Sequence, residues 1–134
     1  MAPAAERRML QIAVGIASLV PVSAGLTGGM DSAAMLAGVD DPLPIDLDSH
    51  YRYLSGLLLG IGVGFAACVP AIERRGALFR ALGLIVVLGG LARLLSLFEH
   101  GLPGPGDRFG LAMALVAVPL LILWQARVAR RTAR

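Results

Sequence analysis

The sequence contains no lysine, a single cysteine and few charged residues of either sign. Charged residues make up 16% of its 134 positions, whereas a soluble domain carries about 25%, so the chain is short of the charge that covers a water-facing surface. A single cysteine excludes a disulfide framework and a cysteine-based zinc cluster. The hydrophobic share of 57% excludes a disordered chain. The composition therefore predicts a membrane protein, and the length predicts one domain.

Four apolar stretches are each long enough to cross a bilayer as a helix, which needs about 20 residues. None of them shows the alternating polarity of a barrel strand, and in lipid a chain that forms no barrel satisfies its backbone hydrogen bonds as helix. The predicted fold is therefore an all-α transmembrane four-helix bundle, made of one domain over residues 1–134. Its spans are predicted at about residues 9–30, 53–72, 77–98 and 109–125.

The first apolar stretch also has the features of a cleavable secretory signal. Arg7 and Arg8 precede it, and Val22-Ser23-Ala24 resembles a small-residue cleavage site. Cleavage would leave three spans. The four-span interpretation is favoured because the stretch stays apolar through Met30 and because four spans divide the charges better.

Arginine is distributed unevenly between the two sides of the predicted bundle. Nine arginines and two glutamates fall on the side of both termini and the second connection, which gives +7. The other side, with the acidic loop of residues 31–51, has three arginines and seven acids, which gives −4 and the total of +3. Arginine collects in cytoplasmic loops, so both termini are predicted to be cytoplasmic in a bacterial inner membrane. Abundant Arg, Ala and Gly without Lys fits a GC-rich bacterial genome, and no base-stacking aromatic residues accompany the arginines, which argues against nucleic-acid binding.

Small residues recur at helical spacing and predict where the helices pack. Rows of glycine and other small residues let two helix backbones approach closely. Such packing drives helix association in lipid, where the hydrophobic effect does not. The glycine row of the second span packs either against a helix of the same chain or, as the alternative, against a second copy in a homodimer. The packing glycines are predicted to be Gly56, Gly60 and Gly64 in the second span and Gly83 and Gly90 in the third. Pro21 and Pro119 lie inside spans and predict kinks.

Arg93 is the most informative single residue because it lies inside a predicted span, five positions before Phe98. A charge within a span is costly and marks a candidate functional site. One interpretation is structural, with Arg93 either snorkelling outward to the membrane surface or paired to Glu99 or to an aspartate of a loop. The other is a site for an anion or polar headgroup, formed by Arg52 and Arg93. The outward polar cluster predicted from the sequence consists of His50, Arg52, Arg93, Ser96, Glu99 and His100.

Motifs for catalysis or cofactor binding are lacking. The sequence has no Gly-x-Ser-x-Gly elbow, no phosphate-binding glycine loop followed by lysine and no His-Glu-x-x-His pair. A metal held by Asp46, Asp48 and His50 is a weaker alternative, because the run offers no fourth ligand at fixed spacing. Haem ligation between His50 and His100 is weaker still, since both lie at the outer boundaries of spans. We therefore expect no catalytic residues, no metal and no cofactor, and Asp48 or Ser49 is expected to cap the second helix.

Three segments together resemble an uncharacterised bacterial family of small four-helix membrane proteins, a domain of unknown function. They are His50–Gly56, Phe79–Ile85 and Gly89–Ser96, and the resemblance extends from about Gln11 to Arg127. It implies a glutamate in the fourth span that pairs with Arg93, at the position where this chain has Ala114. A looser likeness is to DoxX-like four-helix membrane proteins, some of which accompany respiratory or redox systems. Neither resemblance implies a reaction.

The leading functional hypothesis is a non-enzymatic membrane protein, either an accessory or structural subunit or a binder of a lipophilic molecule between helices. The expected partners are the lipid bilayer, a lipid, quinone or other lipophilic ligand, and a larger membrane complex or a homo-oligomer. A small transporter or channel subunit is the first alternative. A membrane enzyme that acts on a lipid or quinone, with His50 or His100 as its base, is the second.

Overall fold

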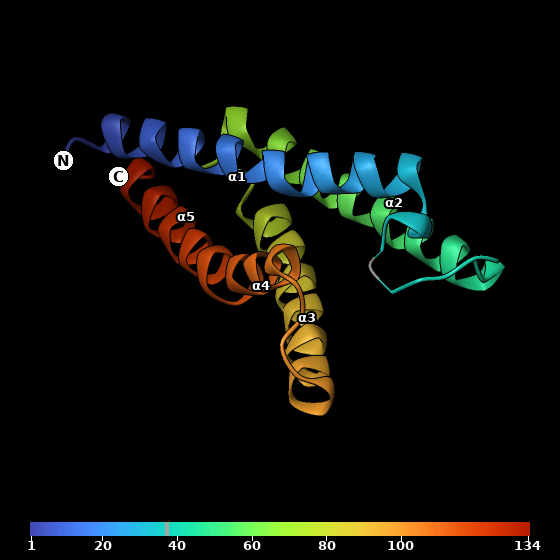
Figure 1. Cartoon of the computed structure of the whole chain (residues 1–134). Coiled ribbons are helices and arrows are strands. Elements are labelled where there is room, and N and C mark those ends of the chain that lie inside the picture. The colour runs from blue at the N-terminus through green and yellow to red at the C-terminus, as the bar shows by residue number, and fades with distance from the viewer. Residues whose placement is uncertain (37) are drawn as a thin grey trace. The chain divides into compact units, whose positions relative to one another are not determined.

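The computed structural model describes residues 1–36 and 38–134, and this described chain is built from helices without a strand. The predicted all-α class is confirmed. Figure 1 shows the helices, which are α1 (Pro3–Asp31), η1 (Ala33–Met35), α2 (Ile45–Cys68), η2 (Val69–Ala71), α3 (Gly76–His100), α4 (Pro105–Ala112), η3 (Met113–Ala117) and α5 (Val118–Thr132). The last three follow one another without a break, so the chain has four long helical segments.

All four segments are long and apolar enough to cross a membrane, by length and composition. The candidate spans are Pro3–Asp31, Ile45–Ala71, Gly76–His100 and Pro105–Thr132. Each is longer than the apolar stretch that predicted it, because hydropathy marks the lipid-buried part of a helix and the helix itself continues among polar residues.

The second segment departs most from its prediction, since α2 begins at Ile45 and not near residue 53. Its first turn carries Asp46 and Asp48, and acids are favourable near a helix N-terminus. The expectation that Asp48 or Ser49 caps this helix is wrong, because both lie inside it. Asp48 instead accepts the backbone N–H of Ala33 at 2.9 Å, at the start of η1.

The chain divides into two compact units. The first is formed by residues 1–12 and 68–134, and the second by residues 13–67. The single domain over residues 1–134 stays a prediction.

In the first unit, α3 packs against the run from α4 to α5. Gly83 lies against Ile122 and Val118, and Gly90 lies against Ala114 and Leu115. An added Cβ at Gly90 would stand 2.7 Å from the Cβ of Ala114, so the two backbones need a glycine there. These are the two third-span glycines that the sequence predicted to pack.

The fourth segment changes its helical geometry just before Pro119. The residues of η3 form a π-helical turn, in which the N–H of Val118 bonds the carbonyl of Met113. Proline has no N–H to offer the carbonyl four residues earlier, and a π-helical turn is one way a helix absorbs such a break. The structure thus shows a local change of hydrogen bonding beside Pro119, and the kink itself stays a prediction.

In the second unit, the later part of α1 packs closely on α2 through glycines. An added Cβ at Gly25 would stand 2.5 Å from the backbone nitrogen of Leu59 and 2.7 Å from the carbonyl oxygen of Ser55. From the other side, Gly62 of α2 lies against Pro21 and Val22 of α1.

Two of the three glycines in the predicted row of the second span lie away from this contact. Gly56 and Gly60 have nothing within 4 Å of an added Cβ, and Gly64 is half-buried. Gly62 is buried and faces α1. The contact face of α2 therefore includes Gly62 and leaves Gly56 and Gly60 open.

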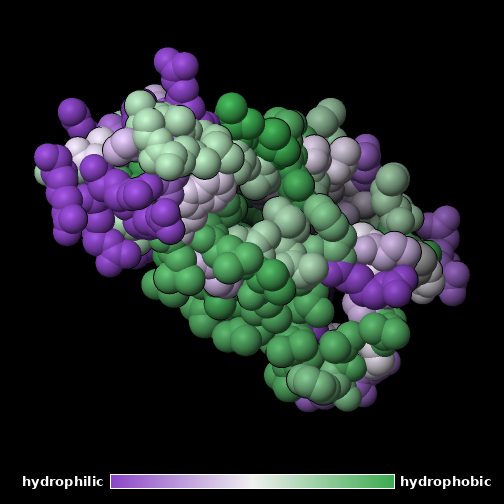
Figure 2. All heavy atoms as spheres, turned by 90° about the vertical axis from the view of Figure 1, so that its left-hand side faces the viewer, coloured by the Kyte–Doolittle hydropathy of each residue, from purple (hydrophilic) through white to green (hydrophobic). Residues whose placement is uncertain are grey.

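Large apolar side chains remain exposed along the helices, among them Leu88, Phe98, Leu120 and Leu123. A soluble monomer rarely exposes apolar patches of more than a few hundred Å². Figure 2 shows a broad hydrophobic surface beside a patch where hydrophilic residues gather. The chain is thus built as a multi-pass membrane protein whose apolar faces meet lipid.

Candidate functional site

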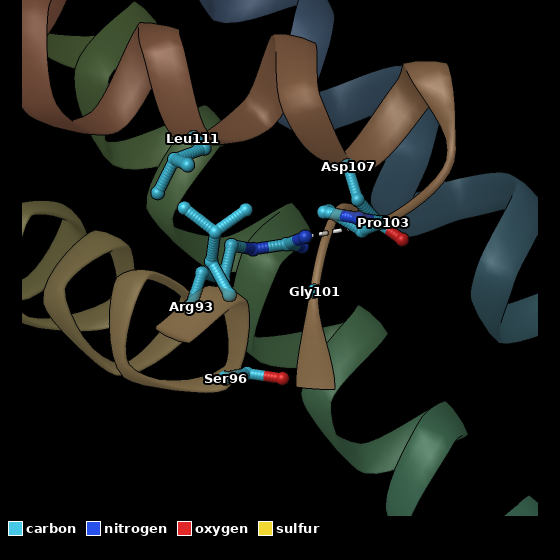
Figure 3. A pocket seen from close by; sticks show the side chains of 7 residues that line it. Arg93, Ser96, Gly101, Pro103, Asp107 and Leu111 are labelled. Carbon is cyan, nitrogen blue, oxygen red and sulfur yellow. Dashed lines mark hydrogen bonds and ion pairs between the residues drawn. The ribbon is translucent and has the colours of Figure 1, made fainter. Parts of the chain in front are cut away.

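The candidate site is a pocket in the first unit where α3 ends and α4 begins. A cavity of about 120 Å³ is lined by Arg93, Ser96, Leu97, Gly101, Pro103, Asp107 and Leu111. Figure 3 shows the Arg93 side chain extending from α3 toward Asp107 of the facing helix. The wall is therefore mixed, with an ion pair on one side and apolar side chains on the other.

The turn that forms the floor of this pocket depends on glycine and proline. Gly101 ends α3 with a φ of 93°, in the left-handed region that glycine adopts without a Cβ penalty. Its N–H bonds the carbonyl of Leu97 at 2.9 Å. Pro105 then occupies the first turn of α4, where its missing N–H costs nothing. This turn thus places α4 opposite the end of α3.

Arg93 and Asp107 form the polar wall. The Nη1 of Arg93 donates to the Oδ1 of Asp107 at 2.5 Å, and both side chains are about half exposed. Asp107 lies in the first turn of α4, where a negative charge also interacts favourably with the helix dipole. Gly110, one turn later, leaves space beside the guanidinium, since an added Cβ would stand 3.9 Å from the Arg93 Cζ.

Of the two partners expected for Arg93, an aspartate of the outer connections forms the ion pair and Glu99 does not. Glu99, the first partner considered, is exposed at the end of α3 and makes no ion pair within the described residues. Asp107 belongs to α4, although it was counted among the acids of the outer connections. Ala114, where the family resemblance implied a glutamate, packs against Gly90. The acidic partner of Arg93 therefore lies on the same helix as Ala114, about two turns earlier.

Arg52 and His50 lie in the second unit and have local partners of their own. The Nε of Arg52 donates to Asp48 Oδ2 at 2.9 Å, and its Nη1 donates to the carbonyl of Gly29 at 2.7 Å. Arg52 therefore holds the carbonyl end of α1, where an arginine is favourable. The Nδ1 of His50 lies 2.9 Å from the Asp46 carbonyl oxygen.

The six residues of the predicted polar cluster belong to two different units. Arg93 and Ser96 line one pocket in the first unit, and Glu99 and His100 are exposed at the end of the same helix. Arg52 and His50 belong to the other unit. Neither unit by itself contains both arginines of the predicted anion site.

A metal site has no geometric support in the part of the chain that the structure describes. No group of three or more His, Cys, Asp or Glu side chains there is arranged to hold an ion. Asp48, one of the three candidate ligands, uses both carboxylate oxygens on Ala33 and Arg52. Cys68 is buried.

Sequence reasoning missed a second polar cluster in the first unit, where the two chain ends meet the hairpin between α2 and α3. Glu6 is buried and binds Arg127 Nε at 2.9 Å and the Nη1 of Arg131. Arg7 Nε binds Glu73 Oε2 at 2.7 Å. Arg127 and Arg131 are one helical turn apart, and this i,i+4 spacing was the available signal.

Glu73 and Gln125 connect the hairpin between α2 and α3 to the neighbouring helices. The hydrogen bond from Arg7 lowers the pKa of the Glu73 carboxyl below its ordinary value of 4.5, against a smaller opposing effect of burial. The fully buried Gln125 donates from Nε2 to the Ile72 carbonyl at 2.8 Å. Both interactions fasten the hairpin to neighbouring helices.

Four apolar helical segments define the class of the protein, which is a multi-pass helical membrane protein. Within that class, the chain belongs to the family described as Domain of unknown function (DUF4345), which residues 9–125 match. No curated protein and no solved structure matches the chain.

Proposed function

We propose that the protein is a non-enzymatic binder of an amphipathic lipophile, whose polar head occupies the pocket between α3 and α4. The observation that carries the proposal is the Arg93–Asp107 pair beside Leu97, Pro103 and Leu111 in one cavity. Ligand sites combine apolar walls with a few polar groups that orient the ligand. An ionisable residue inside a span marks a functional site by default.

The charge of the pocket favours a head that is uncharged and hydrogen-bonding. Asp107 neutralises Arg93, so the pair offers an anion no net attraction. The guanidinium has five N–H donors, of which the bond to Asp107 uses one. The remaining donors suit a carbonyl, ester or hydroxyl oxygen, as found in quinones and in glycerolipids.

The size of the pocket limits what it encloses. Its volume of about 120 Å³ is well below the 300–1,000 Å³ or so of pockets that bury a whole drug-sized ligand. The head of the ligand therefore enters and the tail stays outside. Phe98 and Leu102 are exposed beside the turn and offer an apolar surface for such a tail.

The orientation in the membrane is part of the same proposal. The pairs Glu6–Arg131 and Arg7–Glu73 bring both chain ends and the hairpin to one end of the first unit, which supports a common side for the nine arginines. Arginine-rich sides are cytoplasmic. We infer a bacterial inner membrane protein with both termini in the cytoplasm and the Arg93 pocket toward the outer side.

Native mass spectrometry of the full chain, extracted gently from its own membrane, tests the binding function. We expect a co-purifying adduct with the mass of a lipid or quinone. Arg93→Ala and Asp107→Asn should each reduce its occupancy about tenfold, because a hydrogen bond to a charged group is worth roughly 1.5–3 kcal/mol. Arg108→Ala is the matched control, since Arg108 is an exposed arginine next to Asp107 that does not line the pocket.

A charge exchange separates ligand binding from a purely structural ion pair. The double variant Arg93→Asp with Asp107→Arg restores the pair and should restore thermal stability. It should not restore binding of the ligand, because the guanidinium N–H donors are then attached to α4 and no longer to α3. Absence of any adduct in the unmodified protein overturns the proposal, and a co-purifying protein of defined mass in its place favours the accessory-subunit alternative.

A further inference from the structure

The arginine-rich end of the first unit carries far more positive charge than its own acids neutralise. Glu6 binds Arg127 and Arg131, and Glu73 binds Arg7. The Arg74 side chain is 86% exposed, and its contact with Glu73 is long, with 4.0 Å between Nε and Oε1. Four arginines at this end, Arg8, Arg80, Arg130 and Arg134, are exposed and form no ion pair among the described residues.

A hollow lies within this end of the unit. A cavity of about 280 Å³ is lined by Glu73, Arg74, Ala129, Thr132 and Ala133, between the hairpin and the last turn of α5. Arg130 and Arg131 belong to that last turn. Figure 2 faces the side of Figure 1 on which both chain ends lie, and it shows hydrophilic residues gathered there.

We propose that this hollow binds the phosphodiester headgroup of an anionic phospholipid, with Arg74 of its lining as the principal contact and Arg130 of the adjoining last turn of α5 as the second. Arginine recognises phosphate oxygens through its planar fork of donors. Basic residues near a membrane surface also attract anionic lipid.

The position of the hollow favours a lipid over a soluble anion. It lies where the apolar segments end, at Ala71, Gly76 and Thr132, which is the depth at which headgroups meet a spanning helix. Acyl chains can then follow exposed apolar side chains such as Leu78 and Leu123. A soluble anion gains nothing from that surface.

This site is independent of the Arg93 pocket. Arg93 and Gly76, at the start of α3, are 17 residues apart, which is about 26 Å along a helix. The two sites also differ in charge. The Arg93–Asp107 pair has no net charge, whereas the arginine-rich end of the first unit has more arginines than acids. Loss of one site therefore does not imply loss of the other.

Lipid competition on the full chain tests the inference. The protein in detergent receives an equimolar mixture of phosphatidylglycerol and phosphatidylcholine with identical acyl chains, and native mass spectrometry counts the lipids retained. We expect phosphatidylglycerol to be retained at least about tenfold over phosphatidylcholine, and less so as salt rises. Equal retention of the two lipids overturns the proposal.

Variants assign the preference to the hollow. Arg74→Gln with Arg130→Gln should reduce the preference about tenfold, whereas Arg74→Lys with Arg130→Lys should keep most of it. Arg108→Gln, which removes an exposed arginine of α4, should leave it unchanged. Thermal unfolding of each variant checks the fold. An unchanged preference in a folded Gln variant refutes the site, and displacement of the lipid by millimolar inorganic phosphate refutes the lipid as its ligand.

Discussion

Gln125 shows how a single polar side chain is accommodated in an apolar helix. It is fully buried, and its Nε2 satisfies the Ile72 carbonyl, at the start of the hairpin that follows η2. Its Oε1 has no hydrogen-bond partner among the described residues. A buried polar atom without a partner is costly, so the bond to Ile72 has to offset that cost.

Replacing Gln125 by alanine should destabilise the protein by about 2–4 kcal/mol, because the change opens a cavity and leaves a buried carbonyl without its donor. Thermal unfolding in detergent measures the loss. Leu123→Ala is the control, since Leu123 is 67% exposed on the same helix. Equal shifts for both variants would contradict the role given to Gln125.

At the scale of helices, the distinction between packed and open glycines decides which faces touch. Gly25 lies against the backbone of α2, whereas Gly60 of α2 has open space where a Cβ would be. A sequence row at every fourth position identifies one helix face but not which face meets a neighbour. The contacts of Gly25 and Gly62 answer that question for the second unit.

Gly25→Ala should therefore destabilise the protein by about 1–3 kcal/mol, because the added methyl meets backbone atoms that cannot rotate away. Gly60→Ala should be neutral or stabilising by up to about 1 kcal/mol, since alanine favours helix over glycine. Unfolding midpoints in detergent compare the two. A destabilising Gly60→Ala would show that this face is packed, as a homodimer through α2 requires.

At the scale of the whole molecule, charge is sorted so that acids and arginines hold distant segments together. Glu73 and Arg7 are 66 positions apart in the chain, and Glu6 and Arg131 are 125 apart. Such pairs tie the first helix to the hairpin and to the last helix of the first unit. The same sorting sets the orientation that we propose for the membrane.

The Glu73–Arg7 pair predicts a pH dependence. The folded pKa of Glu73 lies below 4.5, so the folded state binds fewer protons than the unfolded state in acid. Its contribution is present above about pH 4.5 and is lost as the pH falls through the folded pKa. The melting temperature of the protein should exceed that of Glu73→Gln at pH 7, and the two should converge in acid. Glu99→Gln, at an exposed site without an ion pair in the described chain, should show no such convergence.

Topology can be measured because Cys68 is the chain's one cysteine and is buried. In a Cys68→Ala background, Ser49→Cys should react with a membrane-impermeant maleimide in intact cells. Ala2→Cys and Ala133→Cys should react only after permeabilisation, because both ends are proposed to be cytoplasmic. Labelling of either end in intact cells would reverse the orientation and place the Arg93 pocket toward the cytoplasm.

The sequence by itself determined the helical class and the four candidate spans, because both depend on local hydropathy. It also singled out Arg93 and the packing glycines Gly83 and Gly90, since a charge and a gap in side chains are visible without a partner. Only the tertiary structure decided that Arg93 binds Asp107 and that Arg52 binds the carbonyl end of α1. It also decided that Gly62 is a glycine of α2 that packs against α1. Partner choice depends on how helices are rotated about their axes, which hydropathy along the chain leaves open.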